Sequence, residues 1–210
     1  MTDVRSAERL RDDSYRPPVL SSETVFTGAV WNIRRDVVEY GDGRITREYM
    51  DHTGAVAILA LDDQGRVLLI KQYRHPVGLR DWEIPAGLLD KRGEDPLAAA
   101  QRELEEEVDL VAARWDLLND FNSSPGGSNE VIRVYLARDV SSSEQAFHRT
   151  EEERDIEKRW VDLDDVVSAA LGRSIGNSIL TIAALSAQAS RARDWSTLGD
   201  ADTPWPRARD

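Results

Sequence analysis

Three glutamates in the segment Arg102-Glu-Leu-Glu-Glu-Glu107 have the spacing of one helix face. Glu103, Glu106 and Glu107 stand at positions i, i+3 and i+4, which are neighbours on a helix surface. Like charges at this spacing repel one another, and a hard divalent cation such as magnesium, which prefers oxygen ligands, removes that penalty. Upstream, Pro85-Ala-Gly87 bends the chain and can turn a backbone carbonyl toward the same cation. The pattern therefore predicts a carboxylate metal site.

The glutamates alone leave a second interpretation open, because a Glu-rich helix face is typical of ordinary solvated surface. Arg102 lies four residues before Glu106 and is placed to orient that carboxylate. The choice between the two interpretations depends on the sequence around this segment.

A helix from about Pro96 to Val108 is expected to carry the glutamates. Asp95 is a suitable N-cap, and Pro96 fits the first turn, where a missing N–H costs nothing. Apolar residues recur at helical spacing and are expected to face the core: Leu97, Ala100, Leu104 and Val108.

Strands are expected on both sides of this helix. Alternation predicts strands at 26–40 and 44–52, joined by a hairpin turn at Gly41-Asp-Gly43. A second hairpin, through Asp62-Asp-Gln-Gly65, would join the runs 55–61 and 66–72, whose continuous apolar character indicates burial on both faces. Further strands are predicted at 82–85, 131–138 and 159–161, and closing helices at 164–172 and 178–191.

These elements predict an α/β fold, a mixed β-sheet sandwiched between α-helices, with an additional N-terminal β-hairpin. The expected organisation is a flexible arm at 1–20, a hairpin subdomain at 21–53, a catalytic domain at 54–192 and a loosely ordered tail at 193–210. The Pro17-Pro18 pair at the end of the polar arm favours this division.

Composition narrows the classes of function. With 27 basic and 39 acidic residues the net charge is -12, so no overall field attracts nucleic acid or anionic lipid. An anionic substrate then needs a metal or a local arginine cluster. The absence of cysteine excludes disulfides, thiol catalysis and thiolate metal sites. His52, His75 and His148 lack metal-binding spacing, so we expect no histidine zinc site and assign all three structural roles.

The N-terminal segment is charged and lacks the apolar core of a signal peptide. No apolar run approaches the roughly 20 residues of a membrane helix. The expected location is the cytoplasm.

The stretch from Gly87 to Leu110 resembles the signature of the Nudix hydrolase family. That signature is Gly, five residues, Glu, seven residues, and then Arg-Glu-apolar-x-Glu-Glu-x-Gly-apolar. Seven residues separate Glu94 from Arg102 here, and the Arg-Glu-Leu-x-Glu-Glu core matches in full. The resemblance implies the Nudix fold. It also favours a metal site over a solvated surface as the interpretation of the three glutamates.

Two positions depart from this signature. Six residues, not five, separate Gly87 from Glu94, and Asp109 stands where the family has glycine. That glycine ends the helix in a left-handed conformation, which Asp tolerates at some cost. Neither change touches a ligand, so activity is expected to survive, with Asp109 loosening the helix end.

Other segments look like the ADP-ribose pyrophosphatase branch of the family. They are Gln72-Tyr-Arg74, Trp82-Glu-Ile-Pro-Ala-Gly87, Ser124-Pro-Gly-Gly127 and the Glu-rich loop before Trp160. The GLLD-x-x-GE form of the loop is similar to the actinobacterial type, which explains the inserted residue. Relatives of this type are homodimers that exchange N-terminal strands to complete the partner's site, which implies that residues 25–50 cross over here.

The resemblance also implies roles at the metal. Ala86, through its carbonyl, would bind magnesium together with Glu103 and Glu107, with manganese as a substitute, and Glu106 would hold a further metal or position water. Two or three cations would neutralise the diphosphate and activate the attacking water. The general base would be Glu152, with Glu153 as its rival, although that loop alone is typical of a solvated charge run.

Substrate contacts are implied at six positions: Trp31, Arg47, Arg74, Glu83, Gly126 and Glu130. Arg74 would contact a phosphate, Glu130 the terminal ribose or a metal, and Trp31 would stack on adenine near Arg47. A strand tryptophan is more often core or dimer interface. A tight turn is a simpler explanation of Gly126 and its neighbour.

The expected reaction is the hydrolysis of ADP-ribose to AMP and ribose 5-phosphate. A pyrophosphatase for another nucleotide sugar, such as a GDP- or UDP-hexose, remains an alternative, as does a non-catalytic ADP-ribose sensor. The intact carboxylate cluster argues against the sensor, and the charge of -12 argues against messenger-RNA decapping. One sequence leaves open the physiological substrate, the preferred metal and the number of ions.

Overall fold

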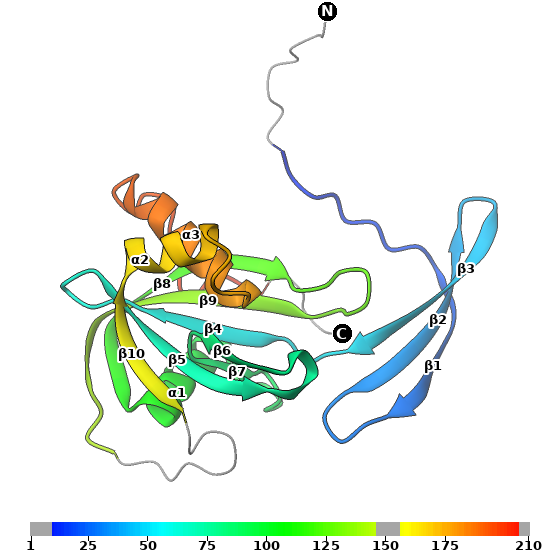
Figure 1. The fold of residues 1–210 in the computed structure, drawn as a ribbon. Helices are drawn as coiled ribbons and strands as arrows, with labels where there is room; N and C mark the ends of the chain where they lie inside the picture. The colour runs from blue at the N-terminus through cyan, green and yellow to red at the C-terminus, as the bar shows by residue number, and fades with distance from the viewer. Residues whose placement is uncertain (1–9, 146–155, 206–210) are drawn as a thin grey trace, which may run out of the picture. The chain divides into compact units, whose positions relative to one another are not determined.

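The computed structural model describes residues 10–145 and 156–205. It separates into two compact units between Asp51 and His52. The first unit holds one three-stranded sheet, and the second holds a five-stranded sheet, a three-stranded sheet and the α-helices (Figure 1). Within the described residues, every helix is too short or too polar to cross a membrane.

The first unit is an antiparallel meander of β1 (Val19–Thr27), β2 (Asn32–Tyr40) and β3 (Gly43–Asp51). The β2–β3 hairpin confirms the predicted turn, in which Gly41 adopts a φ of 58°. A continuous strand over 26–40 is wrong, because the chain turns between β1 and β2. There the Gly28 amide donates to the Trp31 carbonyl at 3.0 Å, and a Cβ on Gly28 would lie 2.4 Å from that oxygen. Strand pairing also begins earlier than expected, since Pro18 accepts from the Glu39 amide at 3.0 Å.

The five-stranded sheet of the second unit has the order β11-β8-β9-β4-β7. Its central strands β4 and β9 are parallel, and the other pairs are antiparallel. The strands are β4 (Ala55–Ala60), β7 (Ala86–Leu88), β8 (Leu110–Asn122), β9 (Val131–Ser142) and β11 (Gly199–Asp200). The helices are α1 (Pro96–Val108), α2 (Leu163–Leu171) and α3 (Ser178–Arg191).

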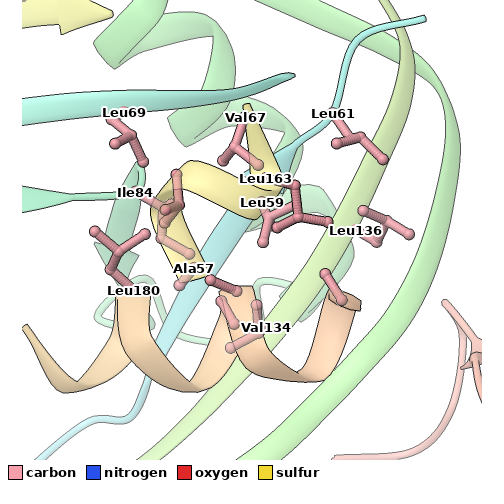
Figure 2. Packing of buried hydrophobic residues seen from close by; sticks show 14 of the residues in the cluster. Ala57, Leu59, Leu61, Val67, Leu69, Ile84, Val134, Leu136, Leu163 and Leu180 are labelled. Carbon is pink, nitrogen blue, oxygen red and sulfur yellow. The ribbon is translucent and has the colours of Figure 1, made fainter. Parts of the chain in front are cut away.

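The central strand β4 is covered on both faces. Ala57 and Leu59 pack toward α2 and α3, with Leu180 among their neighbours (Figure 2). The alternate residues Val56 and Ile58 pack toward α1. This period of two confirms both the burial predicted from the continuous apolar run and the mixed sheet sandwiched between helices.

A second sheet consists of β10 (Glu157–Asp162), β5 (Arg66–Arg74) and β6 (Leu79–Glu83), with the short helix η1 (His75–Val77) between β5 and β6. The predicted hairpin between β4 and β5 is therefore only a turn: a single bridge joins Leu61 to Val67 before the strands enter different sheets. β4 and β5 both carry apolar side chains on both faces. Each strand therefore needs other elements packed against both of its faces.

Two further segments differ from expectation. Residues 110–122, for which no strand was predicted, form β8 and pair with β9 along its length. The chain after residue 192 was expected to be loose, yet β11 pairs with β8. Beyond it, the buried Arg133 donates to the carbonyl oxygens of Thr203, at 2.6 Å, and Pro204, at 3.1 Å. These contacts hold the chain against the sheet as far as the described residues extend.

Candidate active site

Helix α1 begins and ends where the sequence predicted. The Asp95 side chain accepts from the Leu97 amide at 2.9 Å, and Pro96 follows as the first helical residue. Ala100 and Leu104 are fully buried in the core beneath β4. This apolar stripe fixes the rotation of the helix and thereby the direction in which its glutamates point.

Two of the three glutamates pack beneath β7. Oε2 of Glu107 accepts from the Ala86 amide at 3.1 Å, and Glu107 is only 8% exposed. The Glu103 carboxylate lies so close to Gly87 that a Cβ there would be 2.1 Å from Glu103 Cδ. The interpretation of this face as solvated surface is therefore wrong for Glu103 and Glu107, while Glu106 keeps a 41% exposed side chain. Burying a carboxylate costs free energy unless it is paired. Carboxylates gathered out of solvent in this way are typical of a functional site.

Arg102 joins the glutamates into one network. Its Nη1 donates to Oε1 of Glu103 at 2.6 Å and to Oε2 of Glu106 at 2.8 Å. Its Nε and Nη2 hold the two oxygens of Glu94 at 3.0 and 3.1 Å. The expectation that Arg102 orients Glu106 is confirmed, and the arginine supplies positive charge to three carboxylates at once.

The network shifts two pKa values in opposite directions. Burial raises the pKa of Glu103, and the neighbouring Arg102 charge only partly opposes this effect. The hydrogen bond from Arg102 lowers the pKa of Glu94. Glu103 thus carries its charge at a free-energy cost, which a cation close to its oxygens would offset.

The donor set fits a hard divalent cation. Carboxylate oxygens gathered under one strand are the ligands that magnesium prefers. As placed among the described residues, no three acidic or histidine side chains converge on one point that could hold an ion. Glu103 and Glu106 instead face the Arg102 guanidinium, and Glu107 faces the Ala86 amide.

Arg74 and Glu83, both candidate substrate contacts, form a bidentate ion pair. Nε and Nη2 of Arg74 donate to the two oxygens of Glu83 at 2.8 and 2.7 Å. Gln72 also donates to Oε2 of Glu83, at 3.2 Å. Glu83 is 4% exposed, whereas the Arg74 side chain is 44% exposed. Glu83, itself held by Gln72, therefore orients Arg74, and it is the arginine that reaches the surface.

The loop that carries Gly126 and Glu130 is closed by its own hydrogen bonds. The Ser124 carbonyl accepts from the amides of Gly127 and Ser128, both at 2.9 Å. Gly126 lies in this turn, and a Cβ there would meet no atom within 4 Å, so no close approach within the described chain requires glycine at this position. Glu130 pairs with His52, a contact that the sequence did not indicate.

Trp31 and Arg47 belong to the first unit. Trp31 precedes β2, whose first residue Asn32 pairs with Asp51, whereas Arg47 pairs with Asp36. Arg47 therefore lies about five residues along the ladder from Trp31, or roughly 17 Å at 3.3 Å per residue, so the two do not pair across the ladder. The candidate bases Glu152 and Glu153 lie outside the described residues.

Comparison with known proteins bears on this geometry. The sequence model of one protein family, the NUDIX domain, matches residues 51–180 of this chain. An ADP-ribose pyrophosphatase of Mycobacterium tuberculosis is 46% identical over 174 residues, covering 81% of this chain and 82% of the relative. An ADP-ribose pyrophosphatase of Bacillus subtilis is 36% identical, covering 77% of this chain and 87% of the relative.

A solved structure shares the fold. The crystal structure of an ADP compounds hydrolase superposes with a TM-score of 0.71 at 19% identity, covering 87% of this chain and 98% of the neighbour. The matched domain model spans more than half of the chain, including the buried glutamates of α1 and the loop before Glu130. The chain belongs to the Nudix hydrolase family.

Proposed function

We propose that this protein hydrolyses the diphosphate bond of ADP-ribose to AMP and ribose 5-phosphate. The observation that carries the proposal is the pair beneath β7 formed by the partly buried Glu103 and the buried Glu107. Two relatives that are 46% and 36% identical to this chain over aligned segments covering 82% and 87% of their lengths are ADP-ribose pyrophosphatases.

Magnesium is the proposed cofactor, with manganese as a substitute. Its proposed ligands are the Ala86 carbonyl, Glu103 and Glu107, with Glu106 on a further ion or on water. When bound, the cation would neutralise the diphosphate and lower the pKa of the attacking water. Arg102 would then share the glutamates with the cation and keep them on one face of α1.

The attacking water must lose a proton. Glu152, with Glu153 as the alternative, is the proposed acceptor, since both lie in the acidic stretch that precedes β10. A carboxylate there needs only to reach the water by one hydrogen bond to act as general base.

Arg74 is the proposed phosphate contact, because Glu83 and Gln72 fix its planar guanidinium at the surface. Glu130 is the proposed contact to the distal sugar, and the Gly126 turn allows backbone to approach it. Trp31 and Arg47 remain proposed contacts to the adenine portion, from the first unit.

A homodimer with exchanged N-terminal strands is proposed from the surface of the first unit. Large apolar side chains of β1 and the following turn are exposed, among them Val19 at 55%, Phe26 at 61% and Val30 at 65%. A row of this kind is typical of an interface with a second chain. Light scattering after gel filtration should give twice the chain mass of 23.6 kDa, and the mass of a single chain would contradict the proposal.

A substrate panel tests the function. ADP-ribose, a GDP-hexose and a UDP-hexose are incubated with the protein, first with magnesium and then with manganese, and nucleoside monophosphate release is measured. The proposal expects AMP from ADP-ribose at the highest kcat/KM. Faster release of GMP or UMP would assign another nucleotide sugar, and binding of ADP-ribose without any product would indicate a sensor.

A further inference from the structure

His52 is a buried histidine whose two ring nitrogens and backbone amide all have polar partners. It is 4% exposed and lies three residues before the start of β4 (Ala55–Ala60), the first strand of the second unit. Its Nδ1 accepts from the Gly54 amide at 2.9 Å, and its Nε2 lies 3.0 Å from Oε1 of Glu130. Its backbone amide donates to Oδ1 of Asn129 at 2.7 Å. Three contacts thus join this residue to Gly54, just before β4, and to the loop before β9.

The hydrogen bond at Nδ1 determines where the ring carries its proton. A backbone amide can only donate, so Nδ1 must accept and carries no hydrogen. The proton of the neutral ring is therefore on Nε2, which donates it to Oε1 of Glu130. His52 is thus built as a donor directed at one carboxylate oxygen.

The second oxygen of Glu130 is held as well. Ser123 Oγ donates to Oε2 of Glu130, and the Glu130 amide donates to Ser128 Oγ at 3.1 Å. The carboxylate is therefore fixed in plane and direction by a donor on each oxygen. Each oxygen retains a second lone pair, and the side chain is 18% exposed.

Strand topology explains why these residues meet. β4 and β9 are parallel neighbours, with Ala55 opposite Ile132. The residues that lead into the two strands, His52 and Glu130, therefore lie at the same end of the sheet. The β7 strand above Glu103 pairs with β4 on its other side, and its next residue, Leu89, donates to the Gly54 carbonyl at 3.0 Å.

We propose that His52 is a positioning residue that, together with Ser123, presents Glu130 to hydroxyl groups of the distal sugar of the substrate. A fixed carboxylate only accepts hydrogen bonds, so it selects a ligand portion rich in hydroxyl donors, such as a pentose. The neutral His52 ring donates without cancelling the charge of Glu130. This inference rests on the proposed role of Glu130 and goes beyond it.

A matched pair of variants separates positioning from packing. In His52→Asn, Oδ1 can still accept from the Gly54 amide, but the donor to Glu130 is lost. In His52→Gln, the amide nitrogen can occupy the place of Nε2 and restore that donor. Both variants remove the ring: Asn keeps the acceptor for the Gly54 amide and loses the donor to Glu130, whereas Gln keeps the donor and loses that acceptor.

The measurement compares two ligands on each variant. The KM of ADP-ribose reports a substrate with a distal sugar, and the inhibition constant of AMP reports a ligand without one. His52→Asn is expected to raise the KM about tenfold, the effect of weakening one charge-assisted hydrogen bond, with the AMP constant unchanged. His52→Gln is expected to recover most of the loss, and Ser123→Ala, which removes the opposite donor, to show the same selective rise.

Three results would overturn the proposal: an unchanged KM in His52→Asn, a parallel rise in both constants, or no difference between the Asn and Gln variants. If His52→Asn does not fold, Ser123→Ala decides alone by the same comparison. If wild type turns over a different nucleotide sugar, the proposed function fails, and the comparison is made with that sugar and its nucleoside monophosphate.

Discussion

The Arg102 guanidinium donates to Oε1 of Glu103 at 2.6 Å, and the carboxylate of Glu103 lies directly against Gly87. One guanidinium therefore neutralises a carboxylate that burial makes costly to ionise. The same group also binds Glu94 and Glu106. A chain with this network can keep acidic side chains together before a cation joins them, because repulsion among them is already reduced.

Arg102→Ala should destabilise the metal-free protein by about 2–4 kcal/mol, because three partly buried carboxylates lose a charged partner. Denaturant unfolding in a chelator measures this change, and magnesium should restore part of the loss. Arg114→Ala is the control. The Arg114 side chain is 57% exposed, and its Nε lies 3.8 Å from Oδ2 of Asp116. Its cost should stay below about 0.5 kcal/mol. Equal losses in the two variants would contradict the role of Arg102.

Glu103→Gln should make metal-free stability less sensitive to pH. Burial raises the pKa of Glu103, so the folded state keeps this proton to a higher pH than the unfolded state does. Stability is then unpenalised below the unfolded pKa and falls as pH rises through the folded pKa. Melting temperatures in a chelator should therefore favour the Gln variant increasingly from acid to neutral pH. A constant difference across that range would contradict the pKa shift.

Gly87→Ala should reduce turnover roughly 100-fold with little loss of stability. The added Cβ would lie 2.1 Å from Cδ and 2.2 Å from Oε1 of Glu103, and the flexible carboxylate can swing away. A displacement of about 1 Å at a reacting centre can reduce turnover roughly 100-fold. Gly176→Ala is the control, because a Cβ there meets nothing within 4 Å. Steady-state kinetics and thermal melts test this, and an active Gly87→Ala enzyme would refute the placement of Glu103.

At Asp109, an ion pair is expected to offset part of the free-energy cost of a strained backbone conformation. It adopts a φ of 59°, and its Oδ2 lies 2.8 Å from Nζ of Lys158. Asp109→Gly relieves strain of about 1 kcal/mol and loses an exposed pair of about 0.5 kcal/mol, so stability should be equal or higher. Asp109→Ala keeps the strain and loses the pair, and should be destabilised by roughly 0.5–1 kcal/mol. Urea unfolding distinguishes them, and the opposite order would contradict this account.

The sequence predicted those parts of the fold that local signals encode. The cap at Asp95, the proline after it and the apolar stripe specify α1 to the residue. The closing helix predicted at 178–191 is α3, and in the structure Asn177 caps it by accepting from the Leu180 amide. Continuous apolar character also predicted that β4 is buried on both faces.

Features that depend on partners distant in sequence could not be predicted. Glu107 accepts from the β7 backbone, 21 residues away, and the backbone amide of His52 donates to Asn129, 77 residues away. The residues of β8 do not alternate clearly between apolar and polar. The strand is stabilised by its pairing with β9, which its own pattern does not indicate. The chain near Thr203 is held by Arg133, whose burial no local pattern indicates.

The central claim is that the buried carboxylates of α1 support cation-dependent hydrolysis of ADP-ribose. The most direct measurement is AMP release against magnesium concentration for Glu107→Gln and for Glu105→Gln, a control on the same helix whose Oε1 accepts from Ser143 Oγ. We predict a loss of roughly 100-fold or more in Glu107→Gln, with an unchanged melting temperature in chelator, and near wild-type rates in Glu105→Gln. Full magnesium-dependent activity in Glu107→Gln would contradict the claim.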